Sequence, residues 1–142
     1  MTAPVVVADR YELRERIGRG GMAEVHRAFD RQLGREVAVK LLHAAHASEA
    51  AMVERFKREA LTAGSIEHPN IVRVHDSGVA DGTHYLVMEH VGGGTLKDAI
   101  RREGAFAEDR ALDVAAQVAA ALEAAHRRGV VHRDLKPQNI LV

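Results

Sequence analysis

The sequence predicts an α+β fold in which an antiparallel sheet of five strands with one long helix precedes a helical region. Two observations support this prediction. Strand-like alternation of apolar and polar residues dominates the first half, whereas alanine-rich segments at helical spacing dominate the second. A triple glycine, Gly92–Gly94, separates the two patterns. The 142 residues, of which 46% are apolar, are enough for a packed core but few for two full domains.

The five strands are expected where apolar residues alternate between turn signals. They cover Tyr11–Ile17, Glu24–Phe29, Glu36–Leu42, Ile71–Val74 and Tyr85–Met88. Gly34 marks the turn before the third strand, and the dipeptide Asp81-Gly82 is a hairpin signal that joins the last two strands.

Three helices are expected. The first covers Ser48–Ala63 and ends at Gly64, with Phe56 and other apolar residues on one face. A capping box at Thr95–Asp98 opens a short second helix, with Asp in place of the usual Glu. The third is the alanine-rich helix Ala107–Arg128, and Gly129 stands where a helix-terminating glycine belongs.

These elements divide the chain into a flexible tail over residues 1–10, a sheet region over 11–91 and a helical region over 92–142. The tail lacks the basic start and long apolar run of a signal peptide. No apolar run reaches the ~18 residues of a membrane span. We therefore expect a cytoplasmic chain without a membrane segment, although a longer parent protein could carry a downstream anchor.

Composition narrows the function classes. Lys and Arg number 20, and so do Asp and Glu, so net charge gives no support for a nucleic-acid partner. The absence of cysteine excludes disulfides and thiolate metal sites. Of the nine histidines, His43 and His46 are spaced three apart, but no third ligand accompanies them, so we expect no histidine metal site.

Three segments carry chemistry. The glycine-rich run Gly18–Val25 can bring backbone N–H groups close to phosphate oxygens, and the strand-like pattern after it favours a flap between two strands over a dinucleotide-binding turn. A plain structural turn is the alternative. Lys40 ends an apolar strand and needs a partner, for which Glu59, at the edge of the apolar helix face, is a candidate. Pairing of Glu59 within its own helix is the competing explanation.

The third segment, His132–Asn139, combines an Asp that can accept a hydroxyl proton, a Lys that can neutralise phosphate charge and an Asn that can bind a hard cation. In this order the segments resemble the motifs of protein kinases, and the Leu-Lys-Pro-Gln-Asn and Arg-Phe-Lys-Arg-Glu-Ala runs resemble the bacterial serine/threonine branch. The resemblance implies a sheet lobe, a helical lobe that stops just after the catalytic loop, and a cleft for ATP and Mg²⁺.

The resemblance also implies residue roles. Asp134 would take the hydroxyl proton, Lys136 would contact the transferred phosphoryl, Lys40 oriented by Glu59 would bind phosphate, and Asn139 would bind Mg²⁺. The nucleotide-binding positions would be Ile17, Gly18, Arg19, Gly20, Gly21, Met22, Ala23, Val25, Ala38, Lys40, Met88, Glu89, Val91 and Leu141. Ala23 replaces the third glycine of the family pattern, which is tolerable if Ala23 needs no positive φ.

The expected function is transfer of the ATP γ-phosphoryl to Ser and Thr hydroxyls of proteins. The Asp-Phe-Gly motif that supplies the second Mg²⁺ ligand in this family is absent from the sequence. We therefore expect a fragment of a longer kinase, with little phosphotransfer by this chain alone. The alternative is a non-catalytic kinase-like module that binds a nucleotide or a protein partner.

Overall fold

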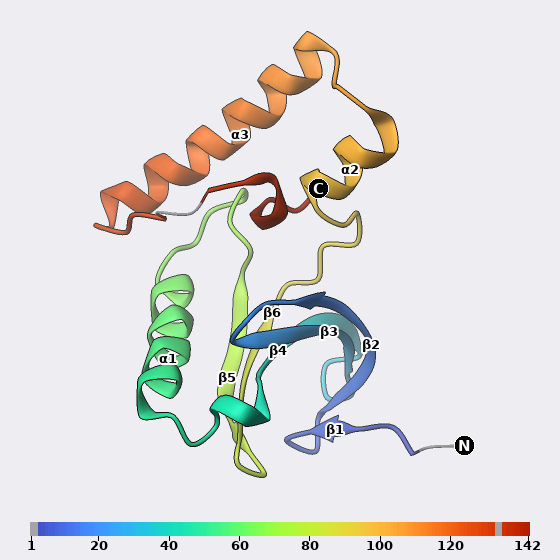
Figure 1. Ribbon diagram of the computed structural model, residues 1–142, viewed down its shortest axis with the longest axis vertical. Helices are drawn as coiled ribbons and strands as arrows, with labels where there is room; N and C mark the ends of the chain where they lie inside the picture. The colour runs from blue at the N-terminus through green and yellow to red at the C-terminus, as the bar shows by residue number, and fades with distance from the viewer. Residues whose placement is uncertain (1–2, 133–134) are drawn as a thin grey trace. The chain divides into compact units, whose positions relative to one another are not determined.

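A computed structural model describes residues 3–132 and 135–142 (Figure 1). The chain forms two compact units. The first consists of the described residues up to Ser65 together with Val72–His90, and the second of Ile66–Ile71 together with the described residues from Val91 onward. Ile66–Ile71 therefore groups with the helical unit, although the sequence places this segment between elements of the sheet region.

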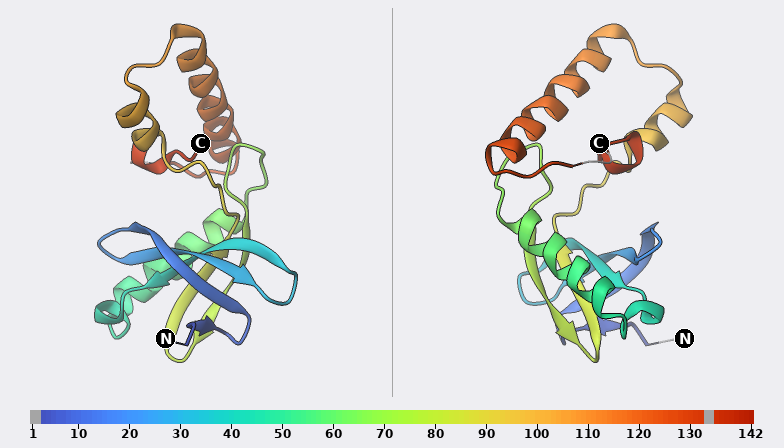
Figure 2. Two further views of the ribbon diagram at one scale, coloured as in Figure 1. Left: turned by 90° about the vertical axis from the view of Figure 1, so that its right-hand side faces the viewer. Right: turned by 60° about the vertical axis from the view of Figure 1, so that its left-hand side comes forward.

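The first unit contains one antiparallel sheet in the strand order β1-β2-β3-β4-β6-β5. The strands are β1 (Val6–Val7), β2 (Tyr11–Arg19), β3 (Ala23–Asp30), β4 (Arg35–Leu42), β5 (Val74–Ala80) and β6 (Thr83–Met88). The sheet is curled, and the helix α1 (Ala50–Gly64) runs along one of its faces (Figure 2).

The sheet has six strands where the sequence predicts five. The additional strand β1 lies in the segment expected to be a flexible tail, where Val6 pairs with Glu12 and Val7 with Tyr11. Two residues are too few to show periodicity, so only the exposed edge of β2 reveals that they form a strand.

The strand expected at Ile71–Val74 lies later, at Val74–Ala80. Its position follows from the hairpin with β6, in which Ala80 pairs with Thr83 across the predicted Asp81-Gly82 turn. Asp81 and Gly82 have φ of 50° and 77°, as a type I′ hairpin turn requires. The turn was therefore predictable, but the length of the strand before it was not.

Alternate residues of β4 contribute to two apolar clusters on opposite faces of the sheet. Val37 and Val39, both fully buried, pack with Tyr11, Ala28, Tyr85 and Val87. Leu42, on the other face, packs with Ala23, Leu86 and Phe56 of α1. Phe56 is 3% exposed and anchors the helix on the sheet, with Val53 and Ala60 beside it.

A buried carboxylate joins the tail to the sheet. Asp30 is 1% exposed and accepts two hydrogen bonds of 2.9 Å from the Arg10 guanidinium, from Nε and from Nη2. It also accepts hydrogen bonds from the backbone N–H groups of Gln32 and Leu33. Arg10 lies in the segment for which the sequence predicts no structure, so this ion pair shows that the end of the tail is tied down.

The second unit contains α2 (Leu96–Glu103), α3 (Glu108–Arg127) and a short 3-10 helix, Pro137–Asn139. The predicted capping box is present, because Thr95 Oγ1 accepts from the Asp98 N–H at 3.1 Å while Asp98 Oδ2 accepts from the Thr95 N–H at 3.2 Å. Gly129, with φ of 75°, ends α3 as predicted. In the part of the chain that the structure describes, no helix is long and apolar enough to cross a membrane.

Candidate functional site

The glycine-rich run forms the turn between two antiparallel strands. Gly18 pairs with Val25 and Arg19 with Glu24, and the Gly20 N–H donates to the Ala23 carbonyl at 2.8 Å. A strand therefore follows the glycines, and the dinucleotide-binding alternative, which needs a helix at that point, is excluded for this segment.

Ala23 has a structural reason to replace glycine. Its φ is not positive, since Ala8, Asp9 and Asp81 are the non-glycine residues with positive φ among those described. Its methyl group is 5% exposed and packs in the cluster of Leu42, Phe56 and Leu86. This position therefore contributes to the core and needs none of the freedom of glycine.

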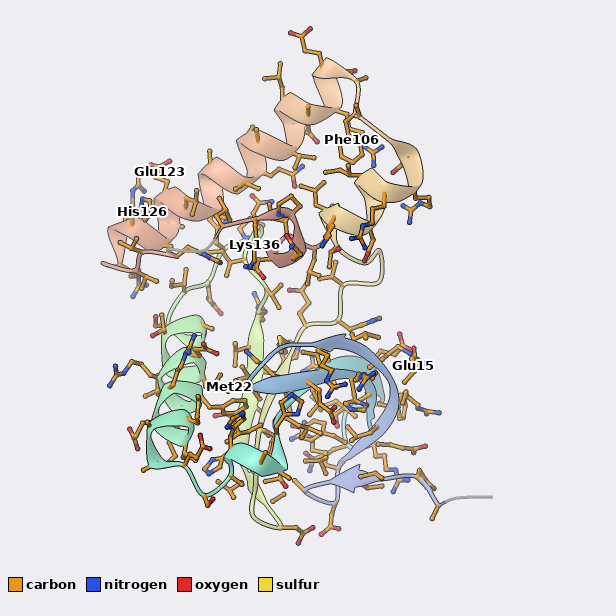
Figure 3. The ribbon with its side chains drawn as sticks, viewed as in Figure 1. Glu15, Met22, Phe106, Glu123, His126 and Lys136 are labelled. Atoms are coloured by element: carbon orange, nitrogen blue, oxygen red, sulfur yellow. The ribbon has the colours of Figure 1, made fainter. Side chains whose placement is uncertain are left out.

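Two backbone donors of the turn are available to a ligand. Among the described residues, neither the Gly21 N–H nor the Met22 N–H donates a hydrogen bond. Gly21 is exposed and Met22 is half-buried, with its side chain against the Ala23 cluster (Figure 3). Adjacent backbone N–H groups of this kind can bind the oxygens of a phosphate.

The carboxylate next to the turn is already paired. Glu24 Oε1 lies 3.1 Å from His26 Nε2, and Glu24 Oε2 lies 3.8 Å from the Arg16 guanidinium. The hydrogen bond from His26 lowers the pKa of Glu24 below its usual range, so Glu24 remains ionised. Its pairing reduces the repulsion that a free carboxylate would exert on an anionic ligand.

Lys40 and Glu59, on β4 and α1, are in contact as the sequence suggests. Lys40 Nζ donates to Glu59 Oε2 at 3.1 Å, and the two side chains are 27% and 42% exposed. The competing intrahelical pair also exists but is looser, with Arg55 Nε 3.8 Å from Glu59 Oε1. Lys40 is therefore held by a carboxylate on a different element while its charge remains accessible to solvent.

The sheet register places several predicted nucleotide-binding residues on one face. Val25 pairs with Lys40, and Ala38 pairs with Met88. Directly paired residues project on the same side of a sheet, as do alternate residues of one strand. Val25, Ala38, Lys40 and Met88 therefore share the face on which α1 packs.

The backbone N–H of Glu89, the residue after β6, is hydrogen-bonded within the first unit. The Glu89 N–H donates to the Arg73 carbonyl at 2.8 Å, and the Arg73 N–H donates to Glu89 Oε2 at 3.1 Å. The Glu89 N–H is therefore occupied, whereas the Glu89 carbonyl accepts no hydrogen bond given for the described residues.

Ile17 lies in β2 of the first unit, and the other remaining predicted residues belong to the second unit. Lys136 precedes the 3-10 helix that contains Asn139, whose N–H donates to the Lys136 carbonyl at 2.9 Å (Figure 3). Leu141 forms a bridge with Thr95, and the Leu96 N–H donates to the Ile140 carbonyl at 2.7 Å. The end of the predicted catalytic loop is thus fastened to the start of α2.

The triple glycine allows the end of the described chain to pack closely against the segment before α2. A Cβ on Gly93 would collide with the carbonyl oxygen of Val142, whose N–H donates to the Gly94 carbonyl at 3.0 Å. Glycine here permits close approach of two backbone segments, a role that the sequence pattern did not reveal.

Asp134, the predicted catalytic base, and its neighbour Arg133 lie outside the described residues, so their roles stay predictions. Val91, Lys136, Asn139 and Leu141 belong to the second unit, whereas the turn, Lys40, Glu59, Met88 and Glu89 belong to the first. Within residues 3–132 and 135–142, no group of three or more His, Asp or Glu side chains could hold a metal ion.

Comparison with known proteins agrees with this geometry. The family model described as "Protein kinase domain" matches residues 11–142. The chain is 45% identical to the serine/threonine-protein kinase PknB of Mycolicibacterium smegmatis, covering 100% of this chain and 23% of PknB. It is 46% identical to a probable serine/threonine-protein kinase of Clostridium perfringens, covering 96% of this chain and 20% of that protein.

A solved structure has the same fold. The kinase domain of Mycobacterium tuberculosis PknI matches with a TM-score of 0.79 and 31% identity, over 99% of this chain and 57% of that domain. The chain thus spans under a quarter of the length of the two curated relatives. With a family model over most of its length and relatives over nearly all of it, the chain belongs to the protein kinase family, in its bacterial serine/threonine branch.

Proposed function

We propose that this chain is the nucleotide-binding part of a kinase that transfers the γ-phosphoryl of ATP to Ser and Thr hydroxyls of protein substrates. The observation that carries the proposal is the contact between Lys40 Nζ and Glu59 Oε2 at 3.1 Å. The contact fixes a cation on the sheet face that also carries Val25, Ala38 and Met88. A fixed, accessible cation is what binding of a polyphosphate requires.

The residues present fit ATP in the first unit. The Gly21 and Met22 N–H groups, which donate to no acceptor among the described residues, supply donors for phosphate oxygens, and Lys40 supplies a positive charge. The apolar side chains of Val25 and Ala38 would pack on adenine, and the carbonyl of Glu89 would accept from its amino group. By the family resemblance, Ile17, Gly18, Arg19 and Gly20 complete the proposed nucleotide contacts of the first unit, and Val91 and Leu141 of the second unit are further proposed adenine contacts.

The second unit would carry the residues that act on the transferred phosphoryl group and on the acceptor hydroxyl. Asp134 would orient the acceptor hydroxyl and take its proton, while Lys136 would balance charge on the phosphoryl group as it transfers. Asn139 would supply one oxygen ligand for Mg²⁺, which neutralises the phosphate charge when it is bound. We propose a cytoplasmic site of action, because ATP is the phosphoryl donor and the chain has no cysteine.

The first experiment measures ATP binding by the 142-residue chain with titration calorimetry. Lys40→Met should weaken ATP affinity by about tenfold or more, because a hydrogen bond to a charged group contributes about 1.5–3 kcal/mol. Lys57→Met is the matched control, since Lys57 is an exposed lysine of α1, and it should bind ATP like the wild type. Equal ATP affinity of the Lys40→Met and wild-type chains would refute the assignment of Lys40.

Transfer itself is tested by incubating γ-labelled ATP and Mg²⁺ with a Ser- and Thr-containing protein. Because Asp-Phe-Gly is absent from the sequence, we expect little labelling by this chain alone. A longer natural product that continues through that motif should label Ser and Thr, and Asp134→Asn should abolish the labelling. If such a product binds ATP but labels nothing, the non-catalytic alternative holds.

A further inference from the structure

His43 and His46, for which the sequence predicts no metal site, both contact the glycine turn. His43 follows β4, and His46 ends the 3-10 helix Ala44–His46. His43 Nε2 lies 3.0 Å from the Gly20 carbonyl oxygen, and His46 Nε2 lies 3.2 Å from the Gly21 carbonyl oxygen. These contacts join the turn to the segment between β4 and α1.

A third contact completes the set. The backbone N–H of His43 donates to the Met22 carbonyl at 2.9 Å, one residue beyond the end of the β3–β4 ladder. Three successive carbonyls, of Gly20, Gly21 and Met22, therefore accept hydrogen bonds from the histidine segment. Met22 marks the location of this turn in Figure 3.

Donor and acceptor chemistry fixes the direction of the two ring contacts. A carbonyl oxygen only accepts, so Nε2 of each histidine must carry the hydrogen. His46 Nδ1 also lies 3.0 Å from Oε2 of Glu49, the residue that precedes the first turn of α1. His46 therefore links the start of α1 to the turn.

The orientation of the carbonyls determines the orientation of the amides. In a planar trans peptide, the C=O of one residue and the N–H of the next point in opposite directions. Hydrogen bonds that hold the Gly20 and Gly21 carbonyls therefore direct the Gly21 and Met22 N–H groups away from the histidines. These are the two amides of the turn that have no hydrogen-bond acceptor in the described part of the chain.

We propose that His43 and His46 are positioning residues that hold the Gly20 and Gly21 peptide planes so that the next two N–H groups are ready to bind phosphate oxygens. The inference rests on the proposed ATP site. Exposed glycines are otherwise free to rotate, and ordering them on binding costs conformational entropy. The two ring contacts reduce this cost before the nucleotide arrives.

Leu and Gln variants separate this role from simple packing. His43→Leu and His46→Leu put an apolar side chain in place of the ring and remove the N–H donor. His43→Gln and His46→Gln retain an N–H donor. We expect each Leu variant to weaken ATP binding by about fivefold, which is the value of one hydrogen bond, and each Gln variant to recover most of the loss. Adenosine, which has no phosphate, should bind all variants equally. His126→Leu, at an exposed histidine of α3, is the matched control.

A second measurement follows the turn without nucleotide. The ¹H–¹⁵N heteronuclear NOE of the Gly20, Gly21 and Met22 amides should fall in the Leu variants and remain near the wild-type value in the Gln variants. Suppose that the wild type binds ATP. The positioning role is then overturned if both Leu variants bind ATP as tightly as the wild type, or if they lose as much affinity for adenosine as for ATP. Either result leaves the proposed function standing. If the wild type binds neither ATP nor adenosine, the proposed function fails and the positioning role fails with it.

Discussion

Replacing Asp30 with Asn should destabilise the sheet unit by about 2 kcal/mol at neutral pH. The substitution keeps an oxygen that can accept from the Gln32 and Leu33 N–H groups. It removes the charge that receives both hydrogen bonds from the Arg10 guanidinium, each 2.9 Å long. Because Asp30 is 1% exposed, water cannot replace the lost partner of Arg10 at this position.

The magnitude follows from two estimates. A hydrogen bond to a charged group contributes about 1.5–3 kcal/mol. Independently, the pKa of Asp30 is lowered from 3.8 to about 2, mainly by the Arg10 guanidinium and in smaller part by the Leu33 and Gln32 N–H groups, and each pKa unit corresponds to about 1.4 kcal/mol. Since the Arg10 side chain is 28% exposed and the Asn variant keeps the Gln32 and Leu33 hydrogen bonds, the share of the second figure that is lost is at most about 2 kcal/mol.

The loss should depend on pH in a defined direction. A carboxyl whose pKa is lower in the folded state stabilises the fold above its ordinary pKa, and that stabilisation disappears as pH falls through the folded value. The difference between wild type and Asp30→Asn should therefore be full at pH 7 and shrink from about pH 4 towards pH 2.

Urea unfolding at pH 7, 4 and 3, followed by circular dichroism, measures the free energy of unfolding of both chains. Asp81→Asn is the control: Asp81 lies in the exposed β5–β6 turn, where Asn adopts positive φ equally well, and its effect should stay below about 0.5 kcal/mol. A difference between Asp30→Asn and wild type that is absent at pH 7, or that grows as pH falls, would show that the ion pair does not stabilise the fold.

Two further substitutions test the core and a half-buried histidine. Phe56→Ala should lower the free energy of unfolding by about 3–5 kcal/mol, because Phe56 is 3% exposed and anchors α1 on the sheet, whereas Leu61→Ala, at a residue of α1 that is 78% exposed, should change it little. A similar effect of both substitutions in urea unfolding would contradict the assigned packing. Burial, reinforced by the Arg35 and Arg73 charges, lowers the pKa of His75 below 6.5, so the stability that His75 contributes should be full above pH 6.5 and decline below it. His75→Gln should flatten the fall in melting temperature between pH 7 and 5, and an unchanged slope would count against this role.

Local signals in the sequence predicted the elements whose structure depends on neighbouring residues. The Asp81-Gly82 hairpin turn, the Thr95–Asp98 capping box and the glycine that ends α3 are present where the sequence placed them. Each depends on a backbone conformation or a hydrogen bond within a few residues. The same holds for α1, whose apolar face is visible in the spacing of its residues.

Long-range pairing decided what the sequence pattern missed. The strand β1 forms only because the edge of β2 is available, and Asp30 is ionised and buried because Arg10, 20 residues away, reaches it. Gly93 is required by the approach of Val142, which no local pattern encodes. In each case the partner lies far along the chain, so only the folded chain brings the two groups together.

The sequence by itself determined the kinase motifs, their order and the chemical types of the site residues, because residue identity sets which atoms can donate, accept or carry charge. The tertiary structure decided which partner each group has. It placed Glu59 on Lys40 more closely than on Arg55, turned Ala23 into a core residue, and aimed two histidines at the glycine turn. The physical reason is that a hydrogen bond depends on distance and direction, and these are set by the packing of elements that are distant in the chain.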